Sequence, residues 1–140
     1  MISLACRKSG NGEPLILLHG NGGESTDFEH QTDYFSSNFQ VFAVDTRGHG
    51  KSPRGTKPLS FPQFAEDLLA FFDEQKIEKA DIIGFSDGAN TAILFAAKYP
   101  TRVRRLVLCG ACTTAKAVKR SVQIPITLGY AVASRFKNPE

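Results

Sequence analysis

Four short, nearly continuous apolar runs, separated by segments with a helical period, constrain the fold of this chain most. The runs cover residues 14–19, 40–45, 80–85 and 104–109, and residues 2–7 form a weaker candidate ahead of them. Strands that are buried on both faces of a parallel sheet have this pattern, because helices exclude water from both sides. The sequence therefore predicts an α/β fold with a mostly parallel sheet.

The segments between the runs carry signals for the start and end of helices. Thr26 and Ser60 each stand three residues before a Glu or Gln, which is the spacing of a capping box. A third predicted helix, over residues 87–99, is rich in alanine and ends before Pro100. Strands that alternate with helices predict right-handed crossovers, with helices on both faces of the sheet.

Length and composition place the chain among ordinary globular domains. Its 140 residues are 41% hydrophobic and 22% charged, enough to bury one core without disulfides or metals. Its apolar runs are far shorter than the roughly 20 residues of a membrane-spanning helix, and no signal peptide opens the sequence. We therefore expect a cytoplasmic protein whose 3 cysteines stay reduced.

The net charge of +3 is unevenly distributed along the chain. Residues 1–100 carry 9 Lys and Arg against 13 Asp and Glu, whereas residues 101–140 carry 8 against 1. A basic tail could bind nucleic acid or anionic lipid, but these charges are spread among apolar residues instead of forming one block. We expect neither a nucleic-acid nor a membrane partner.

The strongest sign of chemistry is a Gly-x-Ser-x-Gly motif at Gly84-Phe85-Ser86-Asp87-Gly88, where a predicted strand meets a predicted helix. A serine on such a sharp turn has a strained backbone and holds its hydroxyl above the sheet, while the two glycines keep side chains out of the turn. We expect Ser86 to act as a nucleophile. The alternative is a helix-capping serine with glycines that serve only the turn.

A second glycine-rich loop, His-Gly-Asn-Gly-Gly at residues 19–23, follows the first buried run. In a parallel sheet this loop lies at the same edge as Ser86, so the backbone N–H groups of Asn21 and Asp87 could form an oxyanion hole. His19 precedes the nucleophile and stands where a strand becomes a loop. We interpret it as a structural histidine that supports the loop and not as a base.

Three other patterns suggest cofactors but do not fit them. Gly50-Lys-Ser lacks the glycine that a phosphate-binding loop requires at position 45, which is Asp45. A dinucleotide fingerprint fails at Ser25. The C-x-x-C at residues 109–112 could be a redox pair or half a zinc site, although packing explains it better. We expect no cofactor and no metal, and we assign Asp45 and Arg47 to holding a loop in place.

These motifs, in this order, resemble the amino-terminal half of the α/β-hydrolase fold superfamily, closest to small biphenyl-hydrolase-like esterases and amidases. The resemblance implies Ser86 as nucleophile, Asn21 and Asp87 as oxyanion donors, and a small ester or amide as substrate. It also implies that residues 1–112 form half of a core that ends after the family's sixth strand. Residues 113–140 would then begin a cap and be poorly anchored.

The family order of catalytic residues is Ser, then Asp or Glu, then His, but no histidine follows Ser86. The acids from there on are Asp87, whose side chain we expect to point elsewhere, and Glu140. One hypothesis is a serine hydrolase that is inactive alone and completed by a second polypeptide or by missing sequence. The other is a non-catalytic half-domain that binds a ligand or partner. Either version leaves residues 104–109 as an open sheet edge for self-association.

Overall fold

The computed structural model describes residues 2–112, which form a five-stranded sheet with strand order β1-β3-β2-β4-β5. Strands β2 to β5 run parallel, and β1 pairs with β3 antiparallel. This confirms the predicted fold class. The bounds of the last four strands lie close to the four apolar runs, whereas the first strand begins four residues after the start of the weaker candidate at residues 2–7. The strands are β1 Cys6–Ser9, β2 Glu13–Leu18, β3 Phe39–Val44, β4 Ala80–Phe85 and β5 Val103–Cys109. The predicted cap, residues 113–140, lies outside the described residues.

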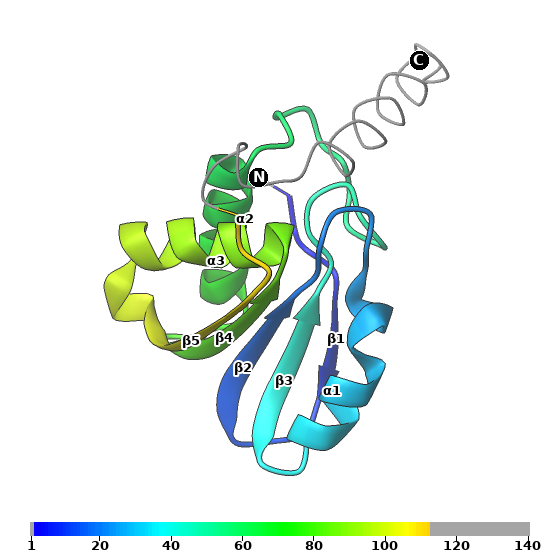
Figure 1. Ribbon diagram of the computed structural model, residues 1–140, viewed down its shortest axis with the longest axis vertical. Helices are drawn as coiled ribbons and strands as arrows, with labels where there is room; N and C mark the ends of the chain where they lie inside the picture. Colours follow the sequence, from blue (N-terminus) through cyan, green and yellow to red (C-terminus); the bar gives the residue numbers. More distant parts are fainter. Residues whose placement is uncertain (1, 113–140) are drawn as a thin grey trace.

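Helices cover both faces of the sheet, as the sequence predicted. Helix α1 lies on one face, and α2 and α3 lie together on the other (Figure 1). Two short 3-10 helices precede α1 and β5. The bounds are η1 Ser25–Phe28, α1 Glu29–Phe35, α2 Phe61–Glu74, α3 Asp87–Lys98 and η2 Pro100–Arg102.

The two capping boxes expected from the sequence have different outcomes. Ser60 caps α2, because its hydroxyl accepts the backbone N–H of Gln63 at 3.4 Å. The expected cap at Thr26 is wrong, since the chain turns two residues earlier and Glu24 caps η1. The N–H of Ser25 donates to the buried Asp45 carboxylate at 2.6 Å. This tertiary contact fixes where η1 begins.

The larger of two apolar clusters fills the space between the sheet and the helices α2 and α3. Aromatic rings form its centre: Phe72 lies 4.9 Å from Phe95 and Phe42 lies 5.9 Å from Phe71, measured between ring centroids. Burying a side chain of this kind contributes roughly 2–3 kcal/mol relative to exposure. A smaller cluster joins β2 and β3 to η1 and α1 through residues that include Leu17, Phe28 and Ala43.

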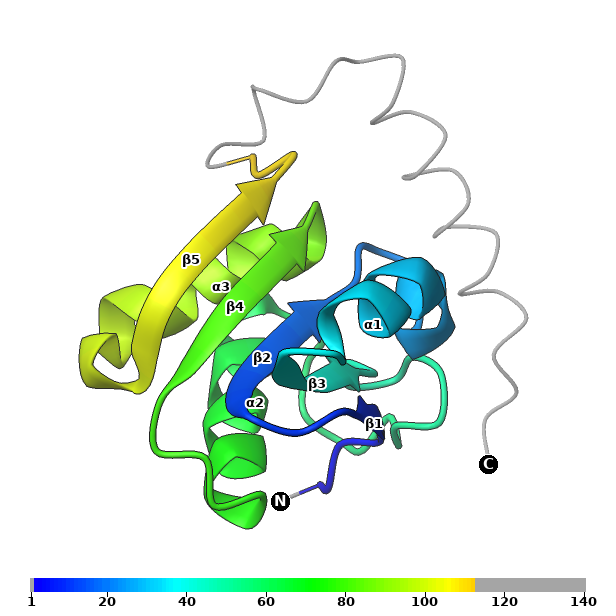
Figure 2. The same cartoon turned by 90° about the horizontal axis from the view of Figure 1, so that it is seen from below.

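The sheet is less well covered over β4 and β5. On the side of α1, no helix among the described residues lies over these two strands (Figure 2). Phe85 and Val107 are accordingly 54% and 50% exposed. Within residues 2–112, β5 also has no strand beside its outer edge, so the open edge expected from the sequence is present there.

The helices of the described part are short or amphipathic. None of those between residues 2 and 112 is both long and apolar enough to cross a bilayer.

Candidate active site

The turn between β4 and α3 holds Ser86 in a strained conformation. Its backbone angles are φ 51° and ψ −114°, in a region that L-amino acids other than glycine seldom adopt. The N–H of Ser86 donates to the carbonyl oxygen of Cys109 at 2.8 Å, and the Ser86 carbonyl accepts the N–H of Ala89 at 2.9 Å. Bonds from the next strand and from the helix therefore hold the turn.

Glycines are required on both sides of Ser86. A Cβ added at Gly84 would lie 2.6 Å from the carbonyl oxygen of Gly88, and one added at Gly88 would lie 2.1 Å from the carbonyl oxygen of Leu18. Both obstacles are backbone atoms, which cannot rotate away. The two glycines thus allow α3 to begin directly against the ends of β2 and β4.

The loop after β2 comes to the same edge of the sheet. A Cβ added at Gly20 would lie 3.2 Å from the Cβ of Ser86, so the loop passes directly beside the serine. Among residues 2–112, the backbone N–H groups of Asn21 and Asp87 have no hydrogen-bond acceptor. Both donors are free beside Ser86, and the N-terminal end of α3 adds a positive dipole there.

His19 is held at both of its ring nitrogens. Nε2 accepts the N–H of Thr46 at 3.0 Å, and Nδ1 lies 2.7 Å from the carbonyl oxygen of Gly20. These contacts require a neutral ring that carries its proton on Nδ1. Burial lowers the pKa of His19 from its ordinary value. The ring therefore links the loop of residues 19–23 to Thr46 and has no nitrogen free to act as a base.

Two carboxylates, those of Asp45 and Asp67, hold the loop after β3 in place. This agrees with a structural role for Asp45 and Arg47. Asp45 accepts the backbone N–H of Ser25 at 2.6 Å and that of Lys51 at 3.0 Å. Burial by itself would raise the pKa of Asp45, but the hydrogen bonds stabilise the charged carboxylate and hold its pKa below the ordinary value. Arg47 is 2% exposed and binds both carboxylate oxygens of Asp67 on α2 at 2.6 Å.

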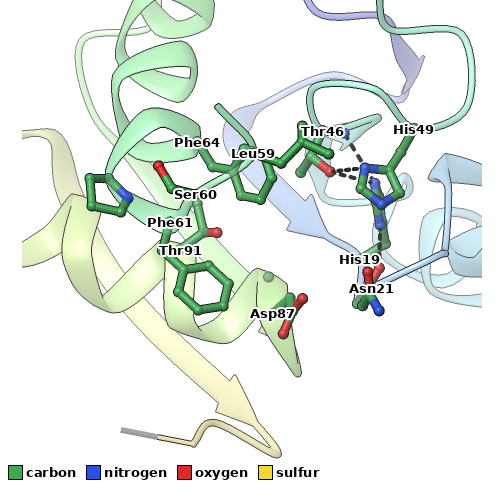
Figure 3. A pocket seen from close by; sticks show the side chains of 13 residues that line it. His19, Asn21, Thr46, His49, Leu59, Ser60, Phe61, Phe64, Asp87 and Thr91 are labelled. Carbon is green, nitrogen blue, oxygen red and sulfur yellow. Dashed lines mark hydrogen bonds between the residues drawn. The ribbon is translucent and has the colours of Figure 1, made fainter. Parts of the chain in front are cut away.

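A pocket of about 570 Å³ opens beside the turn that holds Ser86. Its apolar wall comes from α2 and the segment before it, with Leu59, Phe61 and Phe64. Asp87 and Thr91 line it from α3, and His19 and His49 line the opposite side (Figure 3). Asn21, Asp87 and Gly88 also line it, so the pocket borders the residues that flank Ser86 in space.

Asp87 departs from expectation, because its side chain lines the pocket instead of pointing elsewhere. Its first-turn position on α3 places the carboxyl opposite His19 and His49. Burial raises the pKa of Asp87 above its ordinary value, and the two histidines oppose that shift. The motif alone indicated a role for the N–H of Asp87 and gave no sign of where its carboxyl would lie.

A model of the alpha/beta hydrolase fold family matches residues 13–135. The chain belongs to this family. A curated relative, pyrrolizixenacetamide deacetylase of Xenorhabdus hominickii, is 31% identical over 118 residues, which are 84% of this chain and 44% of that protein. A marine microorganism esterase of known structure aligns with a TM-score of 0.86 and 33% identity, over 96% of this chain and 52% of that one.

Other solved structures of α/β hydrolases agree. A meta-cleavage product hydrolase from Pseudomonas fluorescens IP01 aligns with a TM-score of 0.80 and 29% identity, over 87% of this chain and 46% of that one. The chain spans about half the length of such relatives. The five strands and three longer helices of residues 2–112 correspond to part of the α/β-hydrolase fold.

Within residues 2–112, this α/β hydrolase holds no base in contact with the serine. Ser86 Oγ has no hydrogen-bond partner there, and both nitrogens of His19 are engaged. His49 directs Nδ1 to the Thr46 hydroxyl at 3.2 Å and to the Arg47 carbonyl at 3.1 Å.

No three His, Cys, Asp or Glu side chains of residues 2–112 lie close enough together to hold a metal ion.

The cysteines of the C-x-x-C segment are free thiols in the described part of the chain. Cys112 is half-buried, and its N–H donates to Asn90 Oδ1 on α3 at 3.0 Å. Cys109 is exposed, so the expectation that it serves packing is wrong for this residue. The reason is that its side of β5 has no covering helix among residues 2–112.

Thr91 is a pocket residue that sequence reasoning missed. It lies one helical turn after Asp87, so both face the same side of α3. Its side chain is 1% exposed, and its hydroxyl has no hydrogen-bond partner among residues 2–112. The available signal was a single polar β-branched residue, four positions after Asp87, on a helix otherwise rich in alanine.

Proposed function

We propose that this chain carries the nucleophile and oxyanion hole of a serine hydrolase that acts on small carboxylic esters or related acyl bonds. The observation that supports this most is the backbone of Ser86, held at φ 51° beside the free N–H groups of Asn21 and Asp87. Strain of this size, roughly 1–3 kcal/mol, persists only where surrounding contacts impose it. A serine that merely caps a helix does not need it.

In the proposed reaction, Ser86 Oγ attacks the carbonyl carbon of the ester, and the carbonyl oxygen becomes an oxyanion. The N–H groups of Asn21 and Asp87 donate to that oxygen, and the N-terminus of α3 stabilises its charge. The C–O bond to the alcohol then breaks and leaves an acyl-serine, which water hydrolyses. Both steps need a base that accepts a proton from the attacking oxygen and returns it to the leaving group.

We propose that this base, with the acid that orients it, comes from residues outside the 140-residue sequence. The engaged nitrogens of His19 and the absence of histidine after Ser86 support this. Losing the base of a serine triad costs on the order of 10⁶ in kcat, or roughly 8 kcal/mol of barrier. The chain alone is then nearly inactive, although its nucleophile is in place.

The pocket supports a small, largely apolar substrate. Aromatic and aliphatic side chains dominate the α2 side, where Ser60 is the polar residue, and the other polar groups come from Asp87, Thr91 and the loop residues. The names of relatives agree with acyl chemistry, since one is a deacetylase and another an esterase. An amide in place of the ester is the nearest variant of the same proposal.

Covalent labelling with a fluorophosphonate, read by intact-protein mass spectrometry, tests the proposal. The chain is incubated with the probe in the absence and presence of imidazole, a small base that can enter the open pocket. We expect slow labelling alone, acceleration by imidazole, and one adduct that maps to Ser86. Ser86→Ala should remove the adduct under both conditions, and Ser60→Ala, which changes a serine that lines the neighbouring pocket, should retain it.

The competing hypothesis is a non-catalytic half-domain that binds a ligand or partner. It predicts no adduct at Ser86 at any imidazole concentration, because a helix-capping serine has no oxyanion hole to favour phosphonylation. That outcome would overturn the proposed function.

A further inference from the structure

The Cys-Gly-Ala-Cys segment at residues 109–112 is a sequence motif that the proposed reaction leaves unused. Both of its cysteines are free thiols, and Cys109, the last residue of β5, is exposed. The C-x-x-C spacing is that of dithiols that interconvert with a disulfide. Because Cys109 is exposed, an oxidant in the solvent can reach it.

The chain bends between the two cysteines. Gly110 has φ 66°, a conformation that glycine adopts without strain. A Cβ added there would meet no atom within 4 Å, so the bend projects into open space and has room to move. Three residue steps of extended chain span about 10 Å, whereas a disulfide joins Cα atoms less than about 7 Å apart. The bend brings the two cysteines closer together than an extended chain would.

Both ends of the segment are hydrogen-bonded to the turn that carries Ser86. The carbonyl oxygen of Cys109 accepts the N–H of Ser86 at 2.8 Å, and the N–H of Cys112 donates to Asn90 Oδ1 at 3.0 Å. Asn90 in turn donates its own N–H to the carbonyl oxygen of Ser86 at 3.1 Å. A change in the position of either cysteine therefore alters contacts of the turn that carries Ser86.

The two cysteines are not held equally firmly. Cys109 lies opposite Phe85 in the ladder between β4 and β5 (Figure 2), in addition to its bond with Ser86. Cys112 lies beyond the strand, and its N–H bonds only the side chain of Asn90 within residues 2–112. The two sulfur atoms are not bonded to each other in this structure. Closing a disulfide therefore moves the less restrained residue, Cys112, away from Asn90.

We propose that Cys109 and Cys112 form a reversible disulfide when the chain meets a peroxide, and that this oxidation loosens the turn that holds Ser86. The structure describes the reduced form, in which the bonds to Ser86 and Asn90 are both present. The site is a modification site beside the nucleophile, and its formation does not depend on the hydrolase reaction.

The oxidation proceeds in two steps with hydrogen peroxide as the oxidant. The Cys109 thiolate attacks one peroxide oxygen, the O–O bond breaks, and a sulfenic acid forms while hydroxide leaves and takes up a proton. The sulfur of Cys112 then attacks the sulfenic sulfur, the S–O bond breaks, and the S–S bond forms as water leaves with the thiol proton. The two thiols lose two electrons, which reduce the peroxide to water. A dithiol reductant reverses the change.

Oxidation should slow the reaction of Ser86. When Cys112 moves away, the Asn90 side chain loses the partner that fixes it, and the first turn of α3 becomes less rigid. The strained backbone of Ser86 is then imposed less firmly, since such strain persists only where surrounding contacts require it. Loss of one ordinary hydrogen bond corresponds to about a two- to tenfold change. This effect on labelling rests on the proposed function, whereas the disulfide itself does not.

Peptide mass spectrometry of the purified 140-residue chain tests the disulfide. The reduced chain is exposed to a small molar excess of hydrogen peroxide, unfolded, alkylated with N-ethylmaleimide and digested with trypsin. Cleavage after Arg105 and Lys116 leaves both cysteines in one peptide, residues 106–116. We expect this peptide to carry no maleimide after oxidation and to be lighter by two hydrogen atoms than its dithiol form. Dithiothreitol added before alkylation should restore the peptide with two maleimides.

Single serine substitutions identify the cysteines that react. Cys109→Ser and Cys112→Ser should each abolish the intramolecular disulfide. Cys6→Ser should leave the result unchanged, because β1 and β5 lie at opposite edges of the sheet.

Amide hydrogen exchange, followed by NMR, measures the effect on the turn without assuming any reaction. The N–H of Cys112 should exchange about two- to tenfold faster in the oxidised chain, because it has lost Asn90 as acceptor. Labelling of Ser86 by fluorophosphonate with imidazole should slow by a similar factor and recover with dithiothreitol. Cys112→Ser keeps its backbone N–H, so it should label at the reduced rate with and without peroxide.

An unmodified peptide, oxidation of Cys109 to a sulfinic acid without a disulfide, or a disulfide that joins two chains would overturn the inference. A disulfide that changes neither amide exchange nor labelling would overturn its coupling to Ser86. Absence of labelling in both redox states would overturn the proposed function, and the peptide masses and exchange rates would still decide the inference.

Discussion

The two faces of the sheet differ in how completely they are covered, and the site lies on the better covered one. Toward α2 and α3, Phe72 and Phe95 are fully buried and Arg47 is paired with Asp67. Toward α1, cover extends over β2 and β3, whereas Phe85 and Val107 stay about half exposed. The first face carries α3, which begins directly after Ser86, and the second is an apolar surface suited to contact with further polypeptide.

The largest predicted difference between the faces is in the free energy of unfolding. Phe95→Ala should cost about 4 kcal/mol, because it leaves a cavity between α3 and the sheet. Val107→Ala should cost less than about 1 kcal/mol, since water already reaches half of that side chain. Urea denaturation followed by circular dichroism measures both. Equal losses would mean that the β4–β5 face is packed in solution.

Removing Arg47 should have the next largest effect. Arg47→Met leaves the buried Asp67 carboxylate without its bidentate partner, at a cost of about 3 kcal/mol. Asp73→Asn, which breaks the exposed pair with Arg102, should cost at most about 1 kcal/mol in the same urea titration. A similar small loss for Arg47→Met would show that the loop is held by other contacts.

The free energy of unfolding should depend on pH because His19 is buried. Its pKa is lowered in the fold, so the unfolded chain binds a proton more readily. The stabilising contribution is complete above the unfolded pKa of about 6.5 and is lost as pH falls below it, down to the folded pKa. The expected slope is at most about 1.4 kcal/mol per pH unit. His19→Gln should remove this slope, and His30→Gln, at an exposed position, should not. A slope that persists in His19→Gln belongs to another group.

The uncovered face of β4 and β5, with Phe85 and Val107, should affect the oligomeric state of the chain more than its free energy of unfolding. We expect the chain to self-associate in size-exclusion chromatography with light scattering. Val107→Lys places a charge on the exposed face and should shift the distribution towards monomer. Lys79→Met, a change of charge at an exposed residue before β4, should not. A monodisperse monomer for the unaltered chain would contradict this account of the face.

The strands β2 to β5 were predictable because each contains a continuous apolar run that helices cover on at least one side, whereas β1, with the sequence Cys-Arg-Lys-Ser, has no such run. The start of β4 and its end at Phe85 agree with the sequence to the residue. The placement of Ser86 at a strand-to-helix turn also followed from local signals, namely the two glycines and the strand before them. Its role as nucleophile stays a proposal.

Features that depend on contacts between distant segments were not predictable. Glu24 in place of Thr26 caps η1 because Asp45, directly after β3, binds the N–H of Ser25. Phe61 and Phe64 follow the period of a core-facing helix, yet both line the pocket. The division at residue 112 stays a prediction, because the segment beyond it lies outside the described residues.

The central proposal is that Ser86 is the nucleophile and that its base is not among the residues of this chain. Hydrolysis of p-nitrophenyl acetate by the purified chain, compared with Ser86→Ala, tests it most directly. We predict turnover close to background and little changed by Ser86→Ala. Robust turnover that Ser86→Ala abolishes would contradict the claim and would mean that a histidine within this sequence, His49 first among them, serves Ser86 as its base.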